Sequence, residues 1–564
     1  MAQKTAKQPK PLDLNKLGIK LEDFEVAPRL TPQEVSLNQK KAKKERQKFL
    51  STFTLGLSLG IVIGAILFFV KDAKLAIAGG GGIFVLMMSV NYPYLAIWAF
   101  TAYMPFAGTI TYWIGGGNAL FQLAKDGFAF PAYYSIYQEF KQKKIPFLMP
   151  KGISKALLVF YVFLTITFFL ANVAQQFSNK PEGKPILMAI IGIKVLLGYL
   201  PLLSCTYSLL KTKVQLVWFT RLHVLLAIIC CLLGVLQYQM LSSGACQGTD
   251  HLTGEDLFKA TLEYKCLVGG SLVFSPSQNM IRLPGTFVAP WQWAWFLIGN
   301  TFTTFSTTFS DPSIKWRGVG FLGLVLVFVN ATISGQRIAL LLVPVITIGL
   351  LILTGQLSKP KTFIPIVGGI TILVLGSFIL FPDIIQGRID STISRWNASP
   401  PTDFIAEQAG HSSGTFKPFG YGIARATNSA RVFGEAALIE TYYPKLIYEL
   451  GVGTLAYVGI LTVVTVSTFK AYRSVKDKDL RSYGASFWVF IFFISYQTYY
   501  YPLDVDPVAV YYWMFAGLIL RLPEIDRQES ERKQKALDKI RCLLESKQLK
   551  MYMKELEKSR MRKS

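Results

Sequence analysis

The chain has 564 residues, of which 51% are hydrophobic, 14% aromatic and only 16% charged. This composition is too apolar for an ordinary soluble protein of this length, so the sequence predicts a membrane protein. Much of the formal net charge of +25 lies in the tails: residues 1–48 hold 12 Lys and Arg against 6 Asp and Glu, and residues 523–564 hold 13 against 8. Basic segments stay on the cytoplasmic side, so both tails are expected there and the number of crossings is expected to be even.

Apolar stretches recur along the whole chain and predict an all-α polytopic membrane protein with about 14 transmembrane helices. The polar run to Lys48 is far longer than the basic start of a signal peptide, so the first stretch is expected to remain as a helix. The expected spans lie near residues 50–70, 74–90, 93–113, 118–138, 154–177, 185–210, 214–241, 290–310, 317–334, 336–354, 361–382, 447–469, 483–500 and 506–522. We expect a basic tail over 1–48, a transmembrane domain over 49–522 and a basic helical tail over 523–564.

The charge of the loops sets the expected orientation in the membrane. Lys- and Arg-rich connections such as 141–155 and 470–484 belong on the cytoplasmic side, which leaves the long loops 242–289 and 383–446 on the external side. These assignments predict an integral protein of the cytoplasmic (inner) membrane with a large external loop before the last three spans. Contacts with lipid headgroups explain the basic residues beside the membrane, so membrane lipids are expected partners and nucleic acid is not.

The six cysteines divide according to this topology. Four of them fall within expected spans or in the C-terminal tail, where no bond is expected. Cys246 and Cys266 share the first long external loop, where an oxidising compartment favours a structural disulfide bond. A metal site is not expected, because the sequence has no CxxC or HxxxH pair and its three histidines are scattered.

Charged side chains at membrane depth need a partner or a ligand, because burying one in hydrocarbon costs at least about 2.5 to 3.5 kcal/mol. Lys194 falls inside the expected span 185–210, and two interpretations stay open for it: pairing with an acidic neighbour, or a substrate-binding place beside an anionic ligand. Lys125 and Asp126 lie side by side in the expected span 118–138, where an ion-pair partner or lipid headgroups account for them.

Two arginines stand at the external ends of expected spans. Arg337 follows Ser334 and Gly335 at the start of an otherwise apolar helix, beside helix-terminal N–H groups. Arg282 ends the first long loop, just before a tryptophan-rich span. Because a planar guanidinium group binds two oxygens at once, the pair predicts a clamp for a diphosphate. Arginines that extend to lipid headgroups are the alternative interpretation.

The second long loop mixes charged, aromatic and glycine residues, which suits a sugar-phosphate site but is also common in solvated loops. Its basic residues include Arg388, Arg395, Lys417, Arg425, Arg431 and Lys445. Arg425 and Arg431 are the favoured substrate contacts because they lie close to Glu440 in the chain. Glu440 lies on a segment expected to descend toward the membrane, where partial burial would make its carboxylate a better general base.

Three segments of the chain resemble the motifs of one family. RLPGTFVAPWQWAWFL, which begins at Arg282, resembles the Arg-x-x-Gly-x-Phe-x-x-Pro-Asn segment of O-antigen ligases and Wzy-type O-antigen polymerases. SGQRIALLLVP resembles their Thr-x-Ser-Arg-x-x-Leu-Leu segment, and TYYPKLIYELGVGTLAYVGIL resembles their His-Asn-x-Tyr-Leu-x-x-x-x-Glu-Leu-Gly-x-x-Gly segment. A narrower likeness is to the ligase-like proteins of cyanobacterial hormogonium polysaccharide biosynthesis.

The resemblance implies a GT-C-like, inverting and metal-independent membrane glycosyltransferase without a cofactor. Its substrates would be a polyprenyl-diphosphate-linked glycan donor and a glycan acceptor on the external face, and its further partners other polysaccharide assembly and export proteins. Arg282 and Arg337 match motif arginines, so the resemblance implies that they contact the donor diphosphate. The histidine of the family falls on Glu440. Either Glu440 replaces this histidine as the base, or the base lies elsewhere, or activity is lost.

Two other classes of function stay open. A transporter or flippase for lipid-linked glycans is equally compatible with many spans and with Lys194, although the sequence shows no repeated halves. A non-catalytic component of a polysaccharide export complex is compatible with the missing histidine. The gathering of charged residues beside the long external loops favours glycosyl transfer over both. The sequence does not distinguish a polymerase from a ligase.

Overall fold

The computed structural model describes residues 32–117, 121, 123–147, 151–258, 262–276, 279–356, 400–413 and 416–561, with scattered residues between 368 and 397. The chain divides into two compact units, Ser51–Pro523 and the segments on either side of it. Arg388, Arg395 and most of the expected span 361–382 lie outside the described residues.

Most of the described elements are helices. The longer ones are α1 (Pro32–Val70), α2 (Ala73–Asn91), α3 (Pro93–Tyr103), α6 (Asp126–Gln142), α7 (Lys151–Thr167), α9 (Pro185–Leu197), α10 (Leu202–Leu209), α11 (Lys213–Ser242), α12 (Pro290–Ser310), α13 (Ile314–Ile333), α14 (Arg337–Leu353), α17 (Pro401–Ser413), α18 (Tyr442–Leu450), α19 (Gly453–Ser474), α20 (Lys478–Tyr496) and α21 (Asp506–Met561). Shorter helical segments are η3 (Met104–Phe106), α4 (Ala107–Thr109), η4 (Ile110–Ile114), η5 (Phe168–Val173), α8 (Ala174–Gln176), η6 (Thr249–His251), η7 (Gly254–Phe258), η10 (Asn428–Phe433) and η11 (Pro502–Asp504). Strands β1 (Val273–Ser275) and β2 (Met280–Arg282) pair antiparallel, with Val273 opposite Arg282.

Many of these helices have the length and apolar composition of membrane spans. Among the described residues, eight helices reach both criteria: Ser36–Val70, Ala73–Asn91, Gly152–Gln176, Pro185–Leu209, Lys213–Ser242, Ile314–Ile333, Gly453–Ser474 and Asp506–Cys542. The shorter Arg337–Leu353 is apolar as well. A helix satisfies its own backbone hydrogen bonds, which hydrocarbon cannot do for it. The chain is therefore a helical integral membrane protein.

Helix α12 is the central member of a group of helices, in which it packs against α11, α13, α14 and α20. Nearly all of its side chains are buried although many are Ser or Thr. Their hydroxyls donate to carbonyls one turn earlier, as Thr301 does to Leu297 at 3.0 Å and Thr304 does to Asn300 at 2.7 Å. The Asn300 side chain also donates to the Tyr511 hydroxyl at 3.1 Å, which joins α12 to α21.

Two expected spans differ from the structure in ways that place charged groups. Helix α6 begins at Asp126 rather than near residue 118. The expected span 185–210 is interrupted between α9 and α10, because Pro201 provides no backbone N–H and Gly198 ends α9. The turn that results contains Tyr199, a buried residue between the two helices.

The two tails join neighbouring spans as continuous helices. Helix α1 runs from Pro32 to Val70, and residues 1–31 lie outside the described residues. Helix α21 passes through Pro523, so the expected last span and the expected helical tail are parts of one helix. Arg527 pairs with Glu524 at 2.9 Å one turn earlier, a contact that supports the helix just beyond Pro523.

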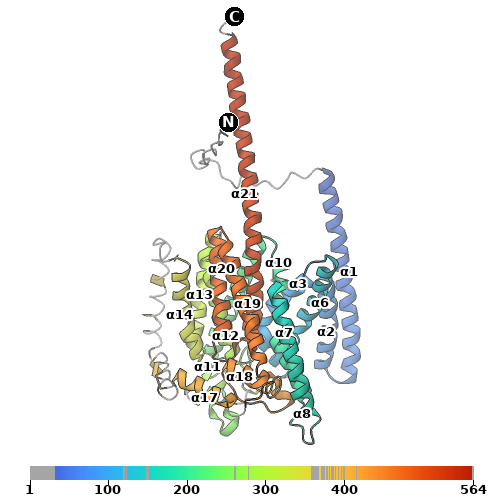
Figure 1. Cartoon of the computed structure of the whole chain (residues 1–564), viewed down its shortest axis with the longest axis vertical. Helices are drawn as coiled ribbons and strands as arrows, with labels where there is room; N and C mark the ends of the chain where they lie inside the picture. The colour runs from blue at the N-terminus through green and yellow to red at the C-terminus, as the bar shows by residue number, and fades with distance from the viewer. Residues whose placement is uncertain are drawn as a thin grey trace. The chain divides into compact units, whose positions relative to one another are not determined.

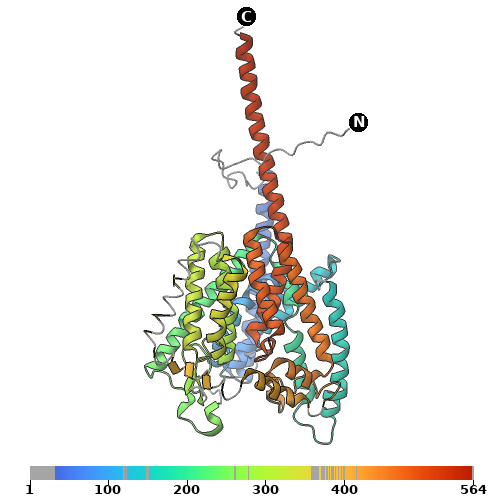
Figure 2. The same cartoon turned by 60° about the vertical axis from the view of Figure 1, so that its left-hand side comes forward.

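The long connections of the Ser51–Pro523 unit meet at one of its ends (Figures 1 and 2). Residues 243–289, which follow α11, lie there together with α17 and α18. Figure 1 places α8 at the same end. We call this end, defined by residues 243–289, α17 and α18, the loop end. It carries the residues discussed next.

Candidate active site

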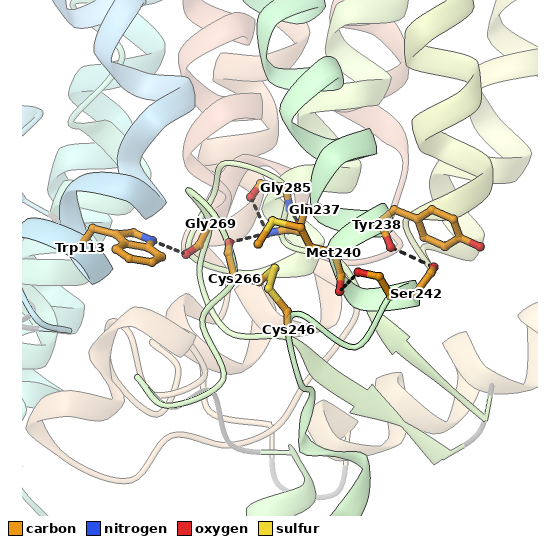
Figure 3. Close-up of a disulfide and its surroundings, with 10 residues drawn as sticks. Trp113, Gln237, Tyr238, Met240, Ser242, Cys246, Cys266, Gly269 and Gly285 are labelled. Carbon is orange, nitrogen blue, oxygen red and sulfur yellow. Dashed lines mark hydrogen bonds between the residues drawn. A yellow bond between two sulfur atoms is a disulfide. The ribbon is translucent and has the colours of Figure 1, made fainter.

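A disulfide closes the loop that follows α11. It joins Cys246 to Cys266, whose Cα atoms lie 5.7 Å apart (Figure 3). The side-chain amide of Gln237 in α11 donates to the Cys266 carbonyl at 3.0 Å and to the Gly285 carbonyl at 3.2 Å. It also accepts from the Gly285 N–H at 3.0 Å. The loop is thus fixed to α11 at several points, and Arg282 lies within it.

Arg282 is the last residue of β2, and the next residue holds this part of the loop in place. Leu283 is buried in a small apolar cluster with Cys266 and Ile333. Its N–H donates to the Ser334 carbonyl at 3.0 Å. The packing and the hydrogen bond together place the backbone of Arg282 beside the connection between α13 and α14.

Gly335 lies at the point of closest approach between this connection and β2. Its φ is +77°, and a Cβ added there would lie 3.2 Å from both the Cα and the Cγ of Arg282. Only glycine adopts this backbone conformation at little cost and leaves room for the neighbouring arginine. Helix α14 begins two residues later at Arg337, so the two guanidinium groups extend from adjoining backbone segments.

The Arg282 side chain is half-buried and has charged neighbours from three other segments. Burial lowers the pKa of its guanidinium and the positive charge of Arg337 lowers it further, whereas Tyr500 and the Glu440 carboxylate raise it. Arg282, Arg337 and Glu440 therefore lie within electrostatic range at the loop end. The buried Nε of Arg282 and the buried Nε2 of Gln336 have no hydrogen-bond partner within the described part of the chain.

Glu440 is held by its backbone immediately before α18. Its N–H donates to the Gln408 side chain of α17 at 2.8 Å, and its carbonyl accepts from the Tyr500 N–H at 2.9 Å. The next residue, Thr441, forms an antiparallel bridge with Tyr499. These contacts leave the half-buried Glu440 carboxylate available for chemistry while the chain that carries it is fixed.

Tyr500 and Tyr501 adopt a conformation that is unusual for bulky residues. Their φ angles are +56° and +32°, which places both in the left-handed region. The Tyr501 hydroxyl accepts a 2.6 Å hydrogen bond from Asn428, and burial raises its pKa to about 12, helped by the nearby Glu440 and Asp504 carboxylates. Backbone strain of this kind persists where the surrounding structure enforces it and is frequent at functional sites.

A buried group of charged side chains lies beside the segment that contains Tyr500 and Tyr501. The Lys445 ammonium pairs with Asp504 at 2.5 Å and with Glu449 at 3.3 Å. The other oxygen of Glu449 accepts from the Ala426 N–H at 2.8 Å and from the Thr427 hydroxyl at 2.9 Å. Helix α18, the chain near Thr427 and the segment after α20 are therefore joined by one ammonium that lies between two carboxylates, and by the hydrogen bonds of Glu449.

Three of the sequence-predicted residues, Arg282, Arg337 and Glu440, thus come together although they are far apart in the chain. Sequence reasoning missed Tyr500 and Gln408. A signal for the first was available, because three consecutive tyrosines before a proline are an unusual way to begin the last span. Nothing in the sequence near Gln408 indicates that its side chain meets the backbone of Glu440.

The two other loop arginines are placed differently. Arg425 is buried and its Nε donates to Gln175 at 2.7 Å, while its Nη1 donates to the Glu182 carbonyl at 3.2 Å. It lines a separate cavity of about 520 Å3 between the loop and the end of α8. Arg431 is exposed at the rim of an adjoining hollow. Arg425 therefore contacts α8 and the chain that follows it.

Lys194 belongs to a charge cluster inside the helical bundle. Its ammonium pairs with Asp126 at 3.1 Å and lies 3.8 Å from Asp506, which in turn pairs with Lys125 at 3.0 Å. The Tyr199 hydroxyl donates to both aspartates, at 3.1 and 3.0 Å. Of the two roles that the sequence left open, the structure supports pairing with acidic neighbours, because carboxylates already balance this cation.

Neither a family model nor a curated protein matches the sequence. The case for a function therefore rests on the geometry at the loop end. In the described ranges, no group of three or more His, Cys, Asp or Glu side chains is placed to hold a metal ion. Among the described residues, the charged groups that the candidate site brings together include Arg282, Arg337 and Glu440.

Proposed function

We propose that this protein is a membrane glycosyltransferase, which moves a glycan from a polyprenyl diphosphate carrier to a hydroxyl group of an acceptor glycan. One observation carries the proposal: Arg282, whose buried Nε has no partner among the described residues, lies against Gly335 two residues before Arg337, and Glu440 is among the charged groups that act on its guanidinium. Strand β2, the start of α14 and the chain before α18 each supply one of these groups. Glycosyl transfer from a diphosphate needs this combination, positive charge for the leaving group and a base for the attacking one.

The arginines would bind the diphosphate of the donor. Arg282 Nε and Gln336 Nε2 are buried donors without a partner among the described residues, and leaving such donors unsatisfied costs about 1 to 3 kcal/mol each. Anionic oxygens would satisfy both. The first N–H groups of α14, which have no acceptor within the helix, would add to the attraction for an anion. Charge that develops on the departing diphosphate would be stabilised by the same groups.

Glu440 would serve as the general base. The hydroxyl oxygen of the acceptor attacks the anomeric carbon of the donor sugar, and a new carbon–oxygen bond forms as the bond from that carbon to the diphosphate oxygen breaks. The proton of the hydroxyl passes to the Glu440 carboxylate, and the electron pair leaves with the polyprenyl diphosphate. One displacement inverts the configuration at the anomeric carbon. Glu440 thereby takes the place that a histidine occupies in the family which the sequence resembles.

The same proposal includes the membrane arrangement and the family. We place the loop end on the external side of the cytoplasmic membrane, with both termini in the cytoplasm, about 14 spans and a GT-C-like fold. The disulfide of Cys246 and Cys266 supports this orientation, because such bonds persist in oxidising compartments. Within the O-antigen ligase and Wzy-type polymerase superfamily, the protein would polymerise or ligate lipid-linked oligosaccharide during polysaccharide biosynthesis.

A transporter of lipid-linked glycans is the second candidate, and the interior charge cluster of Lys125, Asp126, Lys194 and Asp506 favours it. Ionisable residues inside a bundle often mark transport pathways. The two candidates differ in what purified protein does in detergent, where no gradient exists. A glycosyltransferase would still release polyprenyl diphosphate and join glycans, whereas a transporter would do neither.

The test follows release of polyprenyl diphosphate by purified protein that is supplied with lipid-linked oligosaccharide from its own host. Arg282→Ala and Arg337→Ala should each lower the rate of release about 10²- to 10³-fold, the usual effect of removing a donor to developing negative charge. Glu440→Gln should slow joining of glycans while binding of the donor persists. Arg473→Ala, an exposed arginine at the far end of α19, is the matched control and should behave as wild type.

The proposal is abandoned if both arginine variants, shown to be folded by their unchanged unfolding temperature, release polyprenyl diphosphate at the wild-type rate. Loss of release in both variants together with an unaffected Arg473→Ala supports it. Wild-type protein that moves lipid-linked glycan across vesicles but never releases polyprenyl diphosphate would establish the transporter instead.

A further inference from the structure

A polar cavity lies at the loop end, and its lining does not include Arg282, Arg337 or Glu440. It encloses about 520 Å3, a size that suits a small ligand. We call it the Arg425 pocket, and its lining includes Gln175, Lys180, Tyr421, Arg425, Glu435 and Tyr448. The proposed transfer step uses none of these residues.

Two tyrosines form an aromatic side of the Arg425 pocket. The rings of Tyr421 and Tyr448 stack with centroids 4.4 Å apart and planes inclined by 10°. The Lys417 ammonium lies 4.2 Å from the centroid of the Tyr421 ring. Tyr448 and Lys417 thus cover the two faces of Tyr421, and the half-buried Tyr448 offers the apolar surface beside a hydroxyl group. Sugar rings, which combine faces of C–H groups with hydroxyls, fit such a surface.

The polar side of the pocket is rigid. Arg425 is only 7% exposed, and its guanidinium donates to the Gln175 side chain, the Nε at 2.7 Å. The Gln175 amide in turn donates to the Tyr421 carbonyl at 2.7 Å, which fixes the loop to the end of the η5 and α8 helices. Donors that are already held in place lose little freedom when a ligand binds.

Charge distinguishes this pocket from the site of Arg282 and Arg337. Two cationic residues, Lys180 and Arg425, line it together with two anionic ones, Glu182 and Glu435. A lining with balanced charge offers hydrogen bonds in both directions and no net attraction for a diphosphate. This composition favours a glycan with many hydroxyls over an anionic carrier lipid.

The chain itself links the pocket to Glu440. Ala437 lines the pocket and its N–H donates to the Arg425 carbonyl at 2.7 Å. Glu440 follows three residues later, and three residues span at most roughly 10 to 11 Å. The edge of the pocket at Ala437 therefore lies within this distance of the backbone of Glu440, the proposed base.

We propose that the Arg425 pocket binds a short stretch of the acceptor glycan through Tyr421 and Tyr448, and so directs its terminal hydroxyl toward Glu440. The assignment of this glycan as the acceptor rests on the proposed function, whereas the binding of carbohydrate by the pocket does not. Tyr421 and Tyr448 are then specificity-determining residues of a subsite that is separate from the diphosphate clamp.

The experiment measures binding and transfer separately. The probe is the water-soluble oligosaccharide that mild acid releases from the lipid-linked donor of the host, which carries neither lipid nor diphosphate. Calorimetry on the full-length protein in detergent should show about tenfold weaker binding for Tyr448→Ala. Glu435→Ala, a change at an exposed pocket residue, should weaken binding as well and is the safeguard if Tyr448→Ala fails to fold. Leu438→Ala, an exposed residue of the same segment outside the lining, should bind like wild type.

In the transfer assay, Tyr448→Ala should raise the KM for the acceptor about tenfold and leave the release of polyprenyl diphosphate to water unchanged. If the probe binds and its binding depends on Tyr448, but the protein shows no transfer activity, the pocket proposal stands and the proposed function is wrong. Suppose instead that the wild-type protein transfers glycan, but Tyr448→Ala and Glu435→Ala change neither the affinity for the probe nor the KM. This result would overturn the pocket proposal and leave the proposed function standing.

Discussion

Two groups of charged residues, one inside the bundle and one at the loop end, differ in how their charges are balanced. In the interior cluster, Lys125 and Lys194 are paired with carboxylates at 3.0 and 3.1 Å. At the loop end, Arg282 is half-buried with Arg337 and Glu440 as electrostatic neighbours, and its buried Nε has no hydrogen-bond partner within the described residues. Compensated charges stabilise a fold, whereas a buried cationic donor without a partner is what an anionic ligand needs.

The interior cluster should therefore respond to mutation with a loss of stability. Lys125 is 3% exposed, and its removal in Lys125→Met would leave Asp506 without its closest cation. Breaking one partner of a buried pair costs about 3 to 5 kcal/mol, so the unfolding temperature in detergent should fall strongly. Lys143→Met is the matched control, because Lys143 pairs with Glu139 on the same helix but is 58% exposed. Exposed pairs contribute about 0 to 1 kcal/mol.

A double variant sharpens the same test. In Lys125→Met with Asp506→Leu, the pair of Lys194 and Asp126 stays intact at 3.1 Å and no unpaired charge remains. The double variant should recover much of the stability that the single one loses, since apolar replacements of buried pairs are often neutral. If Lys125→Met is no less stable than Lys143→Met, water or lipid compensates the loss of the Lys125 charge. The contrast between the two regions would then fail.

The disulfide comes next in expected effect. Replacing both Cys246 and Cys266 by serine opens a loop with a sequence separation of 20, which costs about 2 to 4 kcal/mol. Arg282 lies outside the closed loop but in the same connection, residues 243–289, so limited proteolysis within this connection and loss of transfer should appear together. Cys542→Ser, at an exposed free cysteine, is the control. Unchanged resistance to protease in the double variant would show that Gln237 and the apolar packing suffice to hold the loop.

Gly335→Ala tests the contact between the two arginines. Alanine at a φ of +77° costs about 1 to 2 kcal/mol, and its Cβ would lie 3.2 Å from two atoms of Arg282. A displacement of about 1 Å at a reacting group can cost about 10²-fold in rate, so transfer should fall far more than stability. Gly318→Ala, where an added Cβ meets no atom within 4 Å, should leave the rate of transfer unchanged and raise stability by roughly 0.5 to 1 kcal/mol, because Gly318 lies within α13. If the loss of transfer in Gly335→Ala is no larger than its loss of stability explains, the cause is general misfolding instead.

The sequence predicted which charged residues lie at the ends of spans better than it predicted which residues they contact. Arg282 was predicted because it lies where a long loop meets an apolar span, and Arg337 because it stands at the start of an otherwise apolar helix; the expected span 290–310 coincides with α12. The turn between α9 and α10 was missed, although Gly198 and Pro201 are the residues that punctuate helices.

Long-range contacts account for most of what the sequence could not show. Asp506 looked like the start of the last span, and only folding reveals that it pairs with Lys125 of another helix. The left-handed φ of Tyr500 has no local sequence signal, because tyrosine rarely adopts it. Arg425 was predicted to act with Glu440 because the two are close in the chain. Its side chain instead donates to Gln175 of α8 and lines the Arg425 pocket.

The smallest expected effect concerns the position of Glu440. Gln408 accepts the Glu440 N–H at 2.8 Å, and Gln408→Ala would remove one hydrogen bond worth about 0.5 to 1.5 kcal/mol. A positioning role predicts that the kcat for glycan joining falls about three- to tenfold, while the KM for the donor and the unfolding temperature stay near wild type. Glu407→Ala, an exposed neighbour on α17, is the control. If Gln408→Ala instead raises the donor KM and leaves kcat alone, Gln408 acts on the diphosphate clamp rather than on the base, and the division of roles at the loop end must be redrawn.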